Sequence, residues 1–288
     1  MVKRARLDTE LVRRHLAPSR TQAAQMITAG QVLVDGQEAL KPARQVELSA
    51  AIVLRDPETV HYASRGAHKL LGALDYLELN GPSTPVIAGA VCLDAGASTG
   101  GFTDVLLRRG AAKVFAVDVG YGQLAWSLRS DSRVVNLERT NVRTLDSALI
   151  DPPADLVVGD LSFISLGLVL PALQRAANPQ AQYLLMVKPQ FEIGRENLGR
   201  GGVVRNPDDR GQTVKNVARQ AHEAGLAVLN VAPAGLAGPS GNVEYFLYLT
   251  AQSAARQQNL PDLEGESLDT AVGEAIAKGP QPETSGAH

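Results

Sequence analysis

From residue 91 onward, short apolar runs alternate with stretches in which apolar residues recur at helical spacing. The apolar runs have the length of strands and comprise Val91–Asp94, Lys113–Asp118, Val134–Leu137, Leu156–Asp160, Tyr183–Lys188, Ala227–Ala232 and Tyr245–Thr250. The helical stretches lie near Phe102–Arg109, Leu124–Arg129, Leu166–Ala177 and Gln212–Ala224. Alternation of this kind predicts an α/β fold with a mostly parallel, doubly wound sheet.

The last two predicted strands differ from the others in their connection. Only residues 233–242 join them, and this segment leaves no room for a crossover helix. These strands should therefore pair antiparallel, as a hairpin. A seven-stranded sheet with an antiparallel last strand resembles that of Rossmann-like methyltransferases and differs from the sheet of dinucleotide-dependent dehydrogenases.

The first 60 residues have the pattern of a small, separate α+β module. Two short helical stretches end at Gly30, and alternating apolar residues then run into Asp35 and Gly36, a strong signal for a hairpin turn. One further strand is expected over about Val46–Leu54. The module contains no pair of residues suited to catalysis, which favours a binding role.

Changes in composition predict where the domains begin and end. The linker is polar, and the last segment loses the strand–helix alternation and should form one short helix and a disordered tail. The predicted segments are a first domain of residues 1–60, a linker of residues 61–68, a second domain of residues 69–252 and a C-terminal segment of residues 253–288.

Composition excludes several classes of protein. The single cysteine, Cys92, lies within a predicted strand and cannot form an internal disulfide, which fits a reducing cytoplasm. The five histidines are scattered, so we expect no metal site. No apolar run reaches the roughly 20 residues that a membrane span needs, and no apolar core follows the basic N-terminus as in a signal peptide. We therefore predict a cytoplasmic protein.

The net charge of −2 conceals opposite charges at the two ends of the chain. Residues 1–20 carry six basic and two acidic residues, whereas residues 254–288 carry two basic and six acidic ones. A basic segment of this kind is suited to a phosphate backbone. The acidic end is expected to be a solvating tail.

A glycine-rich turn follows the first strand of the predicted sheet. Asp94 ends the strand, and Gly96 and Gly100 follow within a tight turn that opens a helix. This spacing differs from the Gly-x-Gly-x-x-Gly pattern of dinucleotide sites, so a nucleotide-like cofactor without a pyrophosphate fits better. Asp118, at the end of the next strand, is placed to receive ribose hydroxyls.

Four polar residues fall at strand ends or close to this turn. Asp160 and Lys188 each end an apolar strand, Glu244 opens the last strand, and Lys69 lies in the first turn of a helix that precedes the sheet. The carboxyl ends of parallel strands are where α/β proteins bind and transform substrates. A cation in the first turn of a helix opposes the helix dipole, which is a mild indication that Lys69 has a function.

The N-terminal module resembles the ribosomal S-four (alpha-L) RNA-binding domain. The resemblance rests on the pattern of residues 6–12, 19–36 and 41–42. It implies a basic helical face that contacts structured RNA. The candidate residues on this module are Lys3, Arg4, Arg6, Arg13, Arg14, Arg20 and Lys41.

The whole chain up to about residue 278 resembles the TlyA family, whose catalytic domain is similar to the FtsJ/RrmJ ribose methyltransferases. The motifs that carry the resemblance are residues 64–70, 94–103, 118–127, 160–166, 187–192 and 238–246. The family implies methyl transfer from S-adenosylmethionine to the ribose 2′-hydroxyl of cytidines in 16S and 23S ribosomal RNA of the small and large subunits. In mycobacterial relatives this modification is linked to capreomycin susceptibility.

The same resemblance implies roles for individual residues. Lys69, Asp160, Lys188 and Glu244 match the catalytic tetrad of these enzymes. A ribose hydroxyl is a poor nucleophile until its proton is drawn away, and Lys188 can act as base only as a neutral amine, so it either deprotonates or orients the hydroxyl. The expected cofactor-binding residues are Asp94, Gly96, Ser98, Thr99, Gly100, Gly101, Phe102, Asp118, Asn141 and Asp160.

Further RNA contacts are expected outside the N-terminal module. These candidates are Arg65 in the linker and Arg195, Arg200 and Arg205 in a glycine-rich loop after the Lys188 strand. Phe163 and Phe191 flank the tetrad, and each can either stack on a displaced base or belong to the core.

Two other functions stay open from the sequence. Relatives of the TlyA family carry a haemolysin label, which would imply a membrane-active protein, yet the chain shows no strongly amphipathic basic helix beyond the RNA-binding one. The second of these alternatives is an RNA-binding ribosome assembly factor without catalysis. Loss of methyl transfer in variants of Lys188 or Asp160 distinguishes an enzyme from both.

Overall fold

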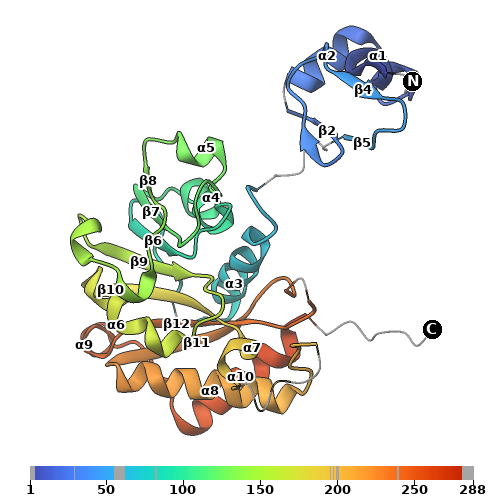
Figure 1. Ribbon diagram of the computed structural model, residues 1–288. Coiled ribbons are helices and arrows are strands. Elements are labelled where there is room, and N and C mark those ends of the chain that lie inside the picture. Colours follow the sequence, from blue (N-terminus) through green and yellow to red (C-terminus); the bar gives the residue numbers. More distant parts are fainter. Residues whose placement is uncertain are drawn as a thin grey trace. The chain divides into compact units, whose positions relative to one another are not determined.

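A computed structural model divides the chain into two compact units, residues 1–61 and 62–288 (Figure 1). The residues that the structure describes are 4–28, 30–54, 62–81, 83–194, 196, 198, 201–238 and 240–280. The predicted disorder of the C-terminal tail falls largely on residues 281–288, which lie outside this set, as do Lys3, Arg195 and Arg200.

The N-terminal unit packs two helices against two small sheets. Its elements are β1 (Arg4–Arg6), α1 (Leu7–Arg13), α2 (Arg20–Thr28), β2 (Val32–Val34), β3 (Gln37–Glu38), β4 (Gln45–Glu47) and β5 (Ile52–Leu54). Strands β1 and β4 pair with each other, and β2 lies between β3 and β5. The predicted hairpin turn at Asp35 and Gly36 is present, with both residues at positive φ. The single strand predicted over Val46–Leu54 is wrong, because a turn divides it into β4 and β5.

The C-terminal unit is built on a seven-stranded sheet with the order β11-β12-β10-β9-β6-β7-β8. Its strands are β6 (Val91–Ala95), β7 (Lys113–Val117), β8 (Val134–Leu137), β9 (Ala154–Gly159), β10 (Ala177–Val187), β11 (Leu226–Pro233) and β12 (Tyr245–Ala251). Strand β12 pairs antiparallel with both β10 and β11, and the other strands pair in parallel. The predicted antiparallel hairpin is therefore confirmed.

Helices cover both faces of this sheet (Figure 1). They are α3 (Ala67–Asn80), α4 (Gly101–Arg108), α5 (Trp126–Arg129), α6 (Leu170–Arg175), α7 (Pro189–Glu192), α8 (Pro207–Glu223), α9 (Gln252–Gln257) and α10 (Gly265–Lys278), with 3₁₀ turns at Val142–Thr144, Ser147–Leu149 and Leu166–Leu168. Side chains of α3, α4, α5 and α9 join one core cluster, and those of α6, α8 and α10 join the other. Successive residues of β6 enter opposite clusters, as the period of a strand requires.

The C-terminal unit is longer at both ends than the predicted second domain. At its start, the Ala63 amide donates to Asp104 Oδ2 at 2.8 Å, and the Arg108 guanidinium lies over the Tyr62 ring, so residues from 62 onward pack on α4. At its end, Leu268 and Val272 of α10 are buried in the core cluster that α8 also enters. Helix α10 therefore belongs to the folded unit and not to a detached tail.

Candidate functional site

The four residues of the predicted tetrad form two buried ion pairs at one end of the sheet. Lys188 Nζ lies 2.5 Å from Asp160 Oδ1, and Lys69 Nζ lies 2.6 Å from Glu244 Oε2. Lys188 follows β10 directly, and Val187 pairs with Tyr245 across the antiparallel ladder, so Lys188 and Glu244 sit at adjoining strand ends. The Gln190 amide, two residues after Lys188, donates to Glu244 Oε1 at 3.2 Å.

Three of these four side chains are almost fully enclosed by protein. The side chains of Lys69 and Lys188 are 9% exposed and that of Glu244 is 3% exposed, whereas Asp160 keeps 23%. The pairing with Glu244 explains why Lys69 occupies the first turn of α3 despite the unfavourable helix dipole. A buried ammonium must be paired, and here each one has a carboxylate partner.

Lys188 makes a second contact that the sequence did not reveal. Its Nζ donates to Ser162 Oγ at 2.8 Å, in the loop that follows Asp160. An ammonium group has three donors, so one N–H of Lys188 remains after the contacts to Asp160 and Ser162. Only the position of Ser162 inside the 160–166 motif hinted at this role.

A cavity of about 510 Å³ opens beside this pair at the carboxyl ends of β6 to β9. The predicted site residues that line it are Gly96, Ser98, Asp118, Asn141 and Asp160. Asp118 is held rigidly, since its two carboxylate oxygens accept the amides of Ser98 at 2.8 Å and Gly120 at 2.7 Å. Gln123, Ser162 and Phe163 also line the cavity, and sequence reasoning did not assign them to it.

Gly96 is the residue that lets the turn approach Asp160. Its φ is +86°, and a Cβ at this position would lie 2.7 Å from the backbone oxygen of Asp160. Any larger residue would therefore push the β6 turn and the β9 loop apart. The glycine thus allows the turn that lines the cavity to pack directly against the backbone of Asp160.

Asp94 is fully buried next to the turn and has one unused oxygen. Thr103 Oγ1 donates to Asp94 Oδ2 at 2.7 Å, whereas Oδ1 has no partner among the described residues. Burial, with a smaller contribution from the charges of Asp160 and Asp118, raises the pKa of Asp94 to about 7. A buried carboxyl with a free oxygen is suited to a cationic ligand group.

The other four predicted residues of the cofactor turn, residues 99–102, are not among those that line the cavity. Phe102 is 3% exposed and belongs to the core, where its ring lies 5.9 Å from that of Phe246. Gly100 and Gly101 are buried, and Thr99 is exposed and does not line the cavity. The helix that follows the turn thus holds its position through apolar contacts.

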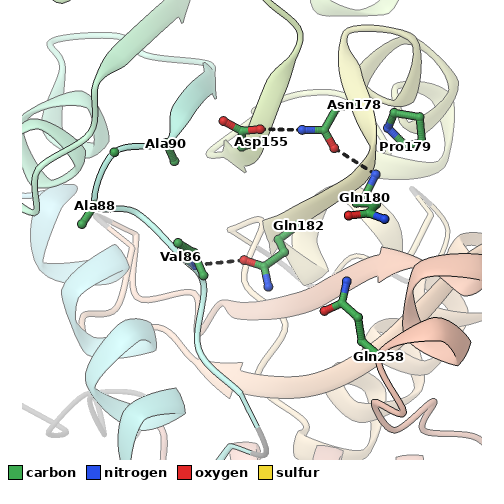
Figure 2. A pocket seen from close by; sticks show the side chains of 10 residues that line it. Val86, Ala88, Ala90, Asp155, Asn178, Pro179, Gln180, Gln182 and Gln258 are labelled. Carbon is green, nitrogen blue, oxygen red and sulfur yellow. Dashed lines mark hydrogen bonds between the residues drawn. The ribbon is translucent and has the colours of Figure 1, made fainter.

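The opposite, amino ends of the strands carry a second hollow of about 720 Å³ (Figure 2). Its polar groups already pair with one another: the Asn178 amide donates to Asp155 at 2.5 Å, and the Val86 amide donates to Gln182 at 2.9 Å. Gln180 and Gln258 add uncharged amides to its lining. The groups that line this hollow include no lysine–carboxylate pair, and it offers no reactive constellation.

The predicted basic residues of the N-terminal unit are largely ion-paired. The buried carboxylate of Asp8 pairs with Arg6 at 2.7 Å and with Arg20 at 3.3 Å. Glu10 is likewise buried and pairs with Arg13 at 2.6 Å and with Arg14 at 2.7 Å. These contacts fix arginines in α2, in α1 and at both ends of α1. Each carboxylate meets two arginines, so both clusters stay positive overall.

The exposure of these arginines separates surface candidates from structural ones. The side chains of Arg4, Arg6, Arg13 and Arg20 are between 45% and 62% exposed, and Lys41, Arg65 and Arg205 are also exposed. Arg14 is only 23% exposed and donates to the backbone oxygens of Leu48 and Ala50 at 2.7 Å. Arg14 therefore ties α1 to the β4–β5 turn, a role that the sequence did not indicate.

We expect the N-terminal unit to lose stability as the pH falls from 4.5 toward about 2. Hydrogen bonds from Arg13 and Arg14 lower the pKa of Glu10 to about 2, and Arg6 lowers the pKa of Asp8 still further. Because these pKa values are depressed on folding, their contribution is fully present above the ordinary value and is lost on protonation. The NMR signals of Ile27, recorded across this pH range in the full chain, measure the loss.

The matched variant for this prediction is Glu10→Gln. It removes the titrating group and keeps the side-chain volume, so the loss of stability between pH 4.5 and about pH 2 should become smaller. An unchanged pH profile in this variant would contradict the assignment to Glu10.

Comparisons with known proteins agree with this geometry. Residues 62–251 match the family model of FtsJ-like methyltransferases, and residues 5–52 match that of the S4 domain. The 16S/23S rRNA (cytidine-2′-O)-methyltransferase TlyA of Mycobacterium tuberculosis is 53% identical over 281 residues, which cover 97% of this chain and 100% of that protein. The chain belongs to the TlyA family. The predicted fold class, a methyltransferase sheet with an S-four type domain, is confirmed.

Two further relatives of this TlyA family chain bear hemolysin names. Hemolysin A of Brachyspira hyodysenteriae is 32% identical and covers 84% of this chain and 98% of its own length. A solved structure from Streptococcus thermophilus with a hemolysin name has a TM-score of 0.69 and 32% identity, covering 96% of this chain and 98% of that one. Within the described part of the chain, no helix combines the length and apolarity that a membrane crossing requires.

Proposed function

We propose that the chain transfers a methyl group from S-adenosylmethionine to the 2′-hydroxyl of cytidines in 16S and 23S ribosomal RNA. The observation that carries this proposal is the buried Lys188–Asp160 pair, which opens onto the cavity lined by Gly96 and Asp118. The named activity of the M. tuberculosis relative, similar over its full length, supports the same reaction and substrate.

The residues around the cavity fit S-adenosylmethionine. The unpartnered Asp94 Oδ1 is suited to the ammonium group of the cofactor, and the fixed carboxylate of Asp118 is suited to its ribose hydroxyls. Gly96 leaves the space beside Asp160 that a side chain would fill. When bound, the cofactor supplies a methyl group that its sulfonium already activates. Asn141, Ser98 and Gln123 also line the cavity, and Asp94 lies buried behind it at the end of β6.

Lys188 is the group that acts on the ribose hydroxyl. Asp160 and Ser162 occupy two of the three hydrogen-bonding directions of Lys188 Nζ, and the third is available to the substrate oxygen. As a neutral amine it accepts the hydroxyl proton, and as an ammonium it orients the hydroxyl. Enclosure of the site by protein strengthens these interactions and excludes competing water.

The second ion pair and the nearby aromatic rings position the nucleotide. The Lys69–Glu244 pair is linked to the Lys188 segment through Gln190. Phe163 is 90% exposed at the mouth of the cavity, and its ring lies 4.9 Å from that of Phe191. An exposed ring beside the reacting groups provides a stacking surface for an unpaired base.

The N-terminal unit would supply the RNA affinity. Its exposed arginines suit phosphate contacts, which fix the position of a nucleic acid without reading its sequence. Because its proposed substrate is ribosomal RNA within small and large subunits, we also propose that the protein works in the cytoplasm.

Transfer of radiolabelled methyl groups to ribosomal RNA tests the proposal. Purified protein is incubated with labelled S-adenosylmethionine and with 30S subunits, 50S subunits or naked RNA, and the modified nucleoside is identified after digestion. We expect 2′-O-methylcytidine in RNA from both subunits. The proposal fails if no substrate gains label, or if the label lies on a base.

The affinity for S-adenosylmethionine is expected to rise with pH up to about 7. Asp94 is protonated below its pKa of about 7 and must lose that proton before it can hold an ammonium group. Each pH unit below this value should therefore weaken binding by about tenfold at most. Isothermal titration calorimetry of the full chain between about pH 5.5 and pH 7 measures the change.

Asp94→Asn is the control for this prediction. The amide cannot titrate, so the affinity of the variant should be lower and nearly independent of pH across the same range. A slope equal to that of the unsubstituted protein would assign the pH dependence to another group.

A further inference from the structure

Two chain segments that carry proposed catalytic groups run beside each other after the sheet. One follows β9 and contains Asp160, Ser162 and Phe163, and the other follows β10 and contains Lys188 and Phe191. At their near ends, Lys188 contacts both Asp160 and Ser162. The two segments therefore depend on each other for the geometry of the site.

Glu192 joins the same two segments at their far ends. It is the last residue of α7, and Ser165 Oγ donates to its Oε2 while the Leu166 amide donates to its Oε1, each at 2.7 Å. Two short hydrogen bonds to one half-buried carboxylate form a strong attachment. Each oxygen of Glu192 has a loop donor, so this carboxylate serves the loop and not the ribose hydroxyl.

The loop between these attachments would not hold its conformation unaided. Phe163 has a φ of +63°, in the left-handed region that costs a residue with a side chain about 1 kcal/mol. The residue is 90% exposed, so burial does not offset that cost. Leu161 and Ile164, on either side of this exposed part, pack against the core cluster. The Phe191 ring, at 4.9 Å, and the attachments at Lys188 and Glu192 hold Ser162 and Phe163 between them.

We propose that Glu192 is a positioning residue, which holds Ser162 against Lys188 and Phe163 against Phe191 by fixing the loop of residues 162–166. This inference rests on the proposed methyl transfer and extends it to a residue outside the tetrad. Glu192 acts through the loop: it keeps the hydroxyl of Ser162 within reach of Lys188 Nζ and keeps the Phe163 ring beside Phe191.

The test compares Glu192→Ala with Glu192→Gln in the methyl transfer assay. The alanine variant loses both hydrogen bonds, and kcat should fall about tenfold to a hundredfold, the effect of a displaced reacting group. The KM for ribosomal RNA should change little, since phosphate contacts elsewhere dominate affinity. Glutamine can accept from the Leu166 amide and donate to Ser165 Oγ, so it should restore most of the rate. Glu223→Ala, at an exposed carboxylate on α8, is the matched control.

A double-mutant cycle with Phe163→Ala separates positioning from overall stability. If Glu192 acts through the loop, the double variant should be little slower than the slower single variant. The reason is that Glu192→Ala alone already displaces the Phe163 ring, so removing that ring has little further effect. Thermal melting of each variant establishes that the assays contain folded protein.

Three results would overturn the inference: an unchanged kcat in folded Glu192→Ala, a glutamine variant as slow as the alanine variant, or effects of Glu192 and Phe163 that multiply independently. Inactivity of the unsubstituted protein in the same assay would instead refute the proposed function, so the two failures are distinguishable.

Discussion

Lys188→Ala should reduce kcat for methyl transfer by roughly 10²–10⁴-fold, the range measured when a general acid–base group is removed. The variant loses the amino group that we propose acts on the ribose hydroxyl. It also leaves the Asp160 carboxylate without its partner at 2.5 Å. Binding of S-adenosylmethionine should persist, because the cavity walls at Gly96 and Asp118 remain. Initial rates at saturating cofactor, together with calorimetric cofactor affinity, measure both quantities.

Two further variants make this prediction specific. Lys113→Ala removes a lysine at the amino end of β7, where Nζ donates to Asp151 O, and should leave the rate unchanged. Lys188→Arg keeps a permanent positive charge and so can orient the hydroxyl but cannot accept its proton. An arginine variant as slow as the alanine variant would assign Lys188 as the base, and a fast one would assign it as an orienting group. A fully active Lys188→Ala would remove Lys188 from the mechanism.

The fold was predictable because its signals are local. Each strand is a short apolar run. The short connection before Tyr245 requires an antiparallel hairpin, whatever residues elsewhere in the chain do. The prediction was wrong where one apolar pattern spans a turn, as between β4 and β5. The predicted second domain also ended too early. The apolar residues of α10 are recognisable as core residues only once α8 and the sheet are seen to pack against them.

The candidate site was predictable only in part, for a physical reason. Residues at the carboxyl ends of parallel strands must converge, so Asp160 and Lys188 could be identified from their positions alone. Hydrogen bonds between loops depend on how those loops fold together, and this is why the contacts of Ser162 and Glu192 were missed. A sequence motif also does not show which of its residues bind a ligand and which pack in the core. Phe102 belongs to the glycine-turn motif, yet its ring is in the core.

Gly96→Ala should weaken S-adenosylmethionine binding by roughly tenfold to a hundredfold. The added Cβ would lie 2.7 Å from the backbone oxygen of Asp160, in the space between the β6 turn and the β9 loop. Relief of such an overlap requires a backbone shift that costs about 1–3 kcal/mol, and every 1.4 kcal/mol is a factor of ten in affinity. Methyl transfer should fall further, since the shift also moves Asp160 away from Lys188. Calorimetric titration and single-turnover rates separate the two effects.

Gly89→Ala is the matched control, because it isolates the cost of backbone conformation. Gly89 has a φ of +76°, close to the +86° of Gly96, but a Cβ there would meet no atom within 4 Å. Both substitutions therefore pay the same conformational penalty of about 1 kcal/mol, and only Gly96→Ala adds the overlap with Asp160. Gly89 lines the hollow at the amino ends of the strands, so Gly89→Ala should leave the cofactor affinity unchanged. Equal cofactor affinities in the two variants would show that the close approach of Gly96 to Asp160 contributes nothing to cofactor binding.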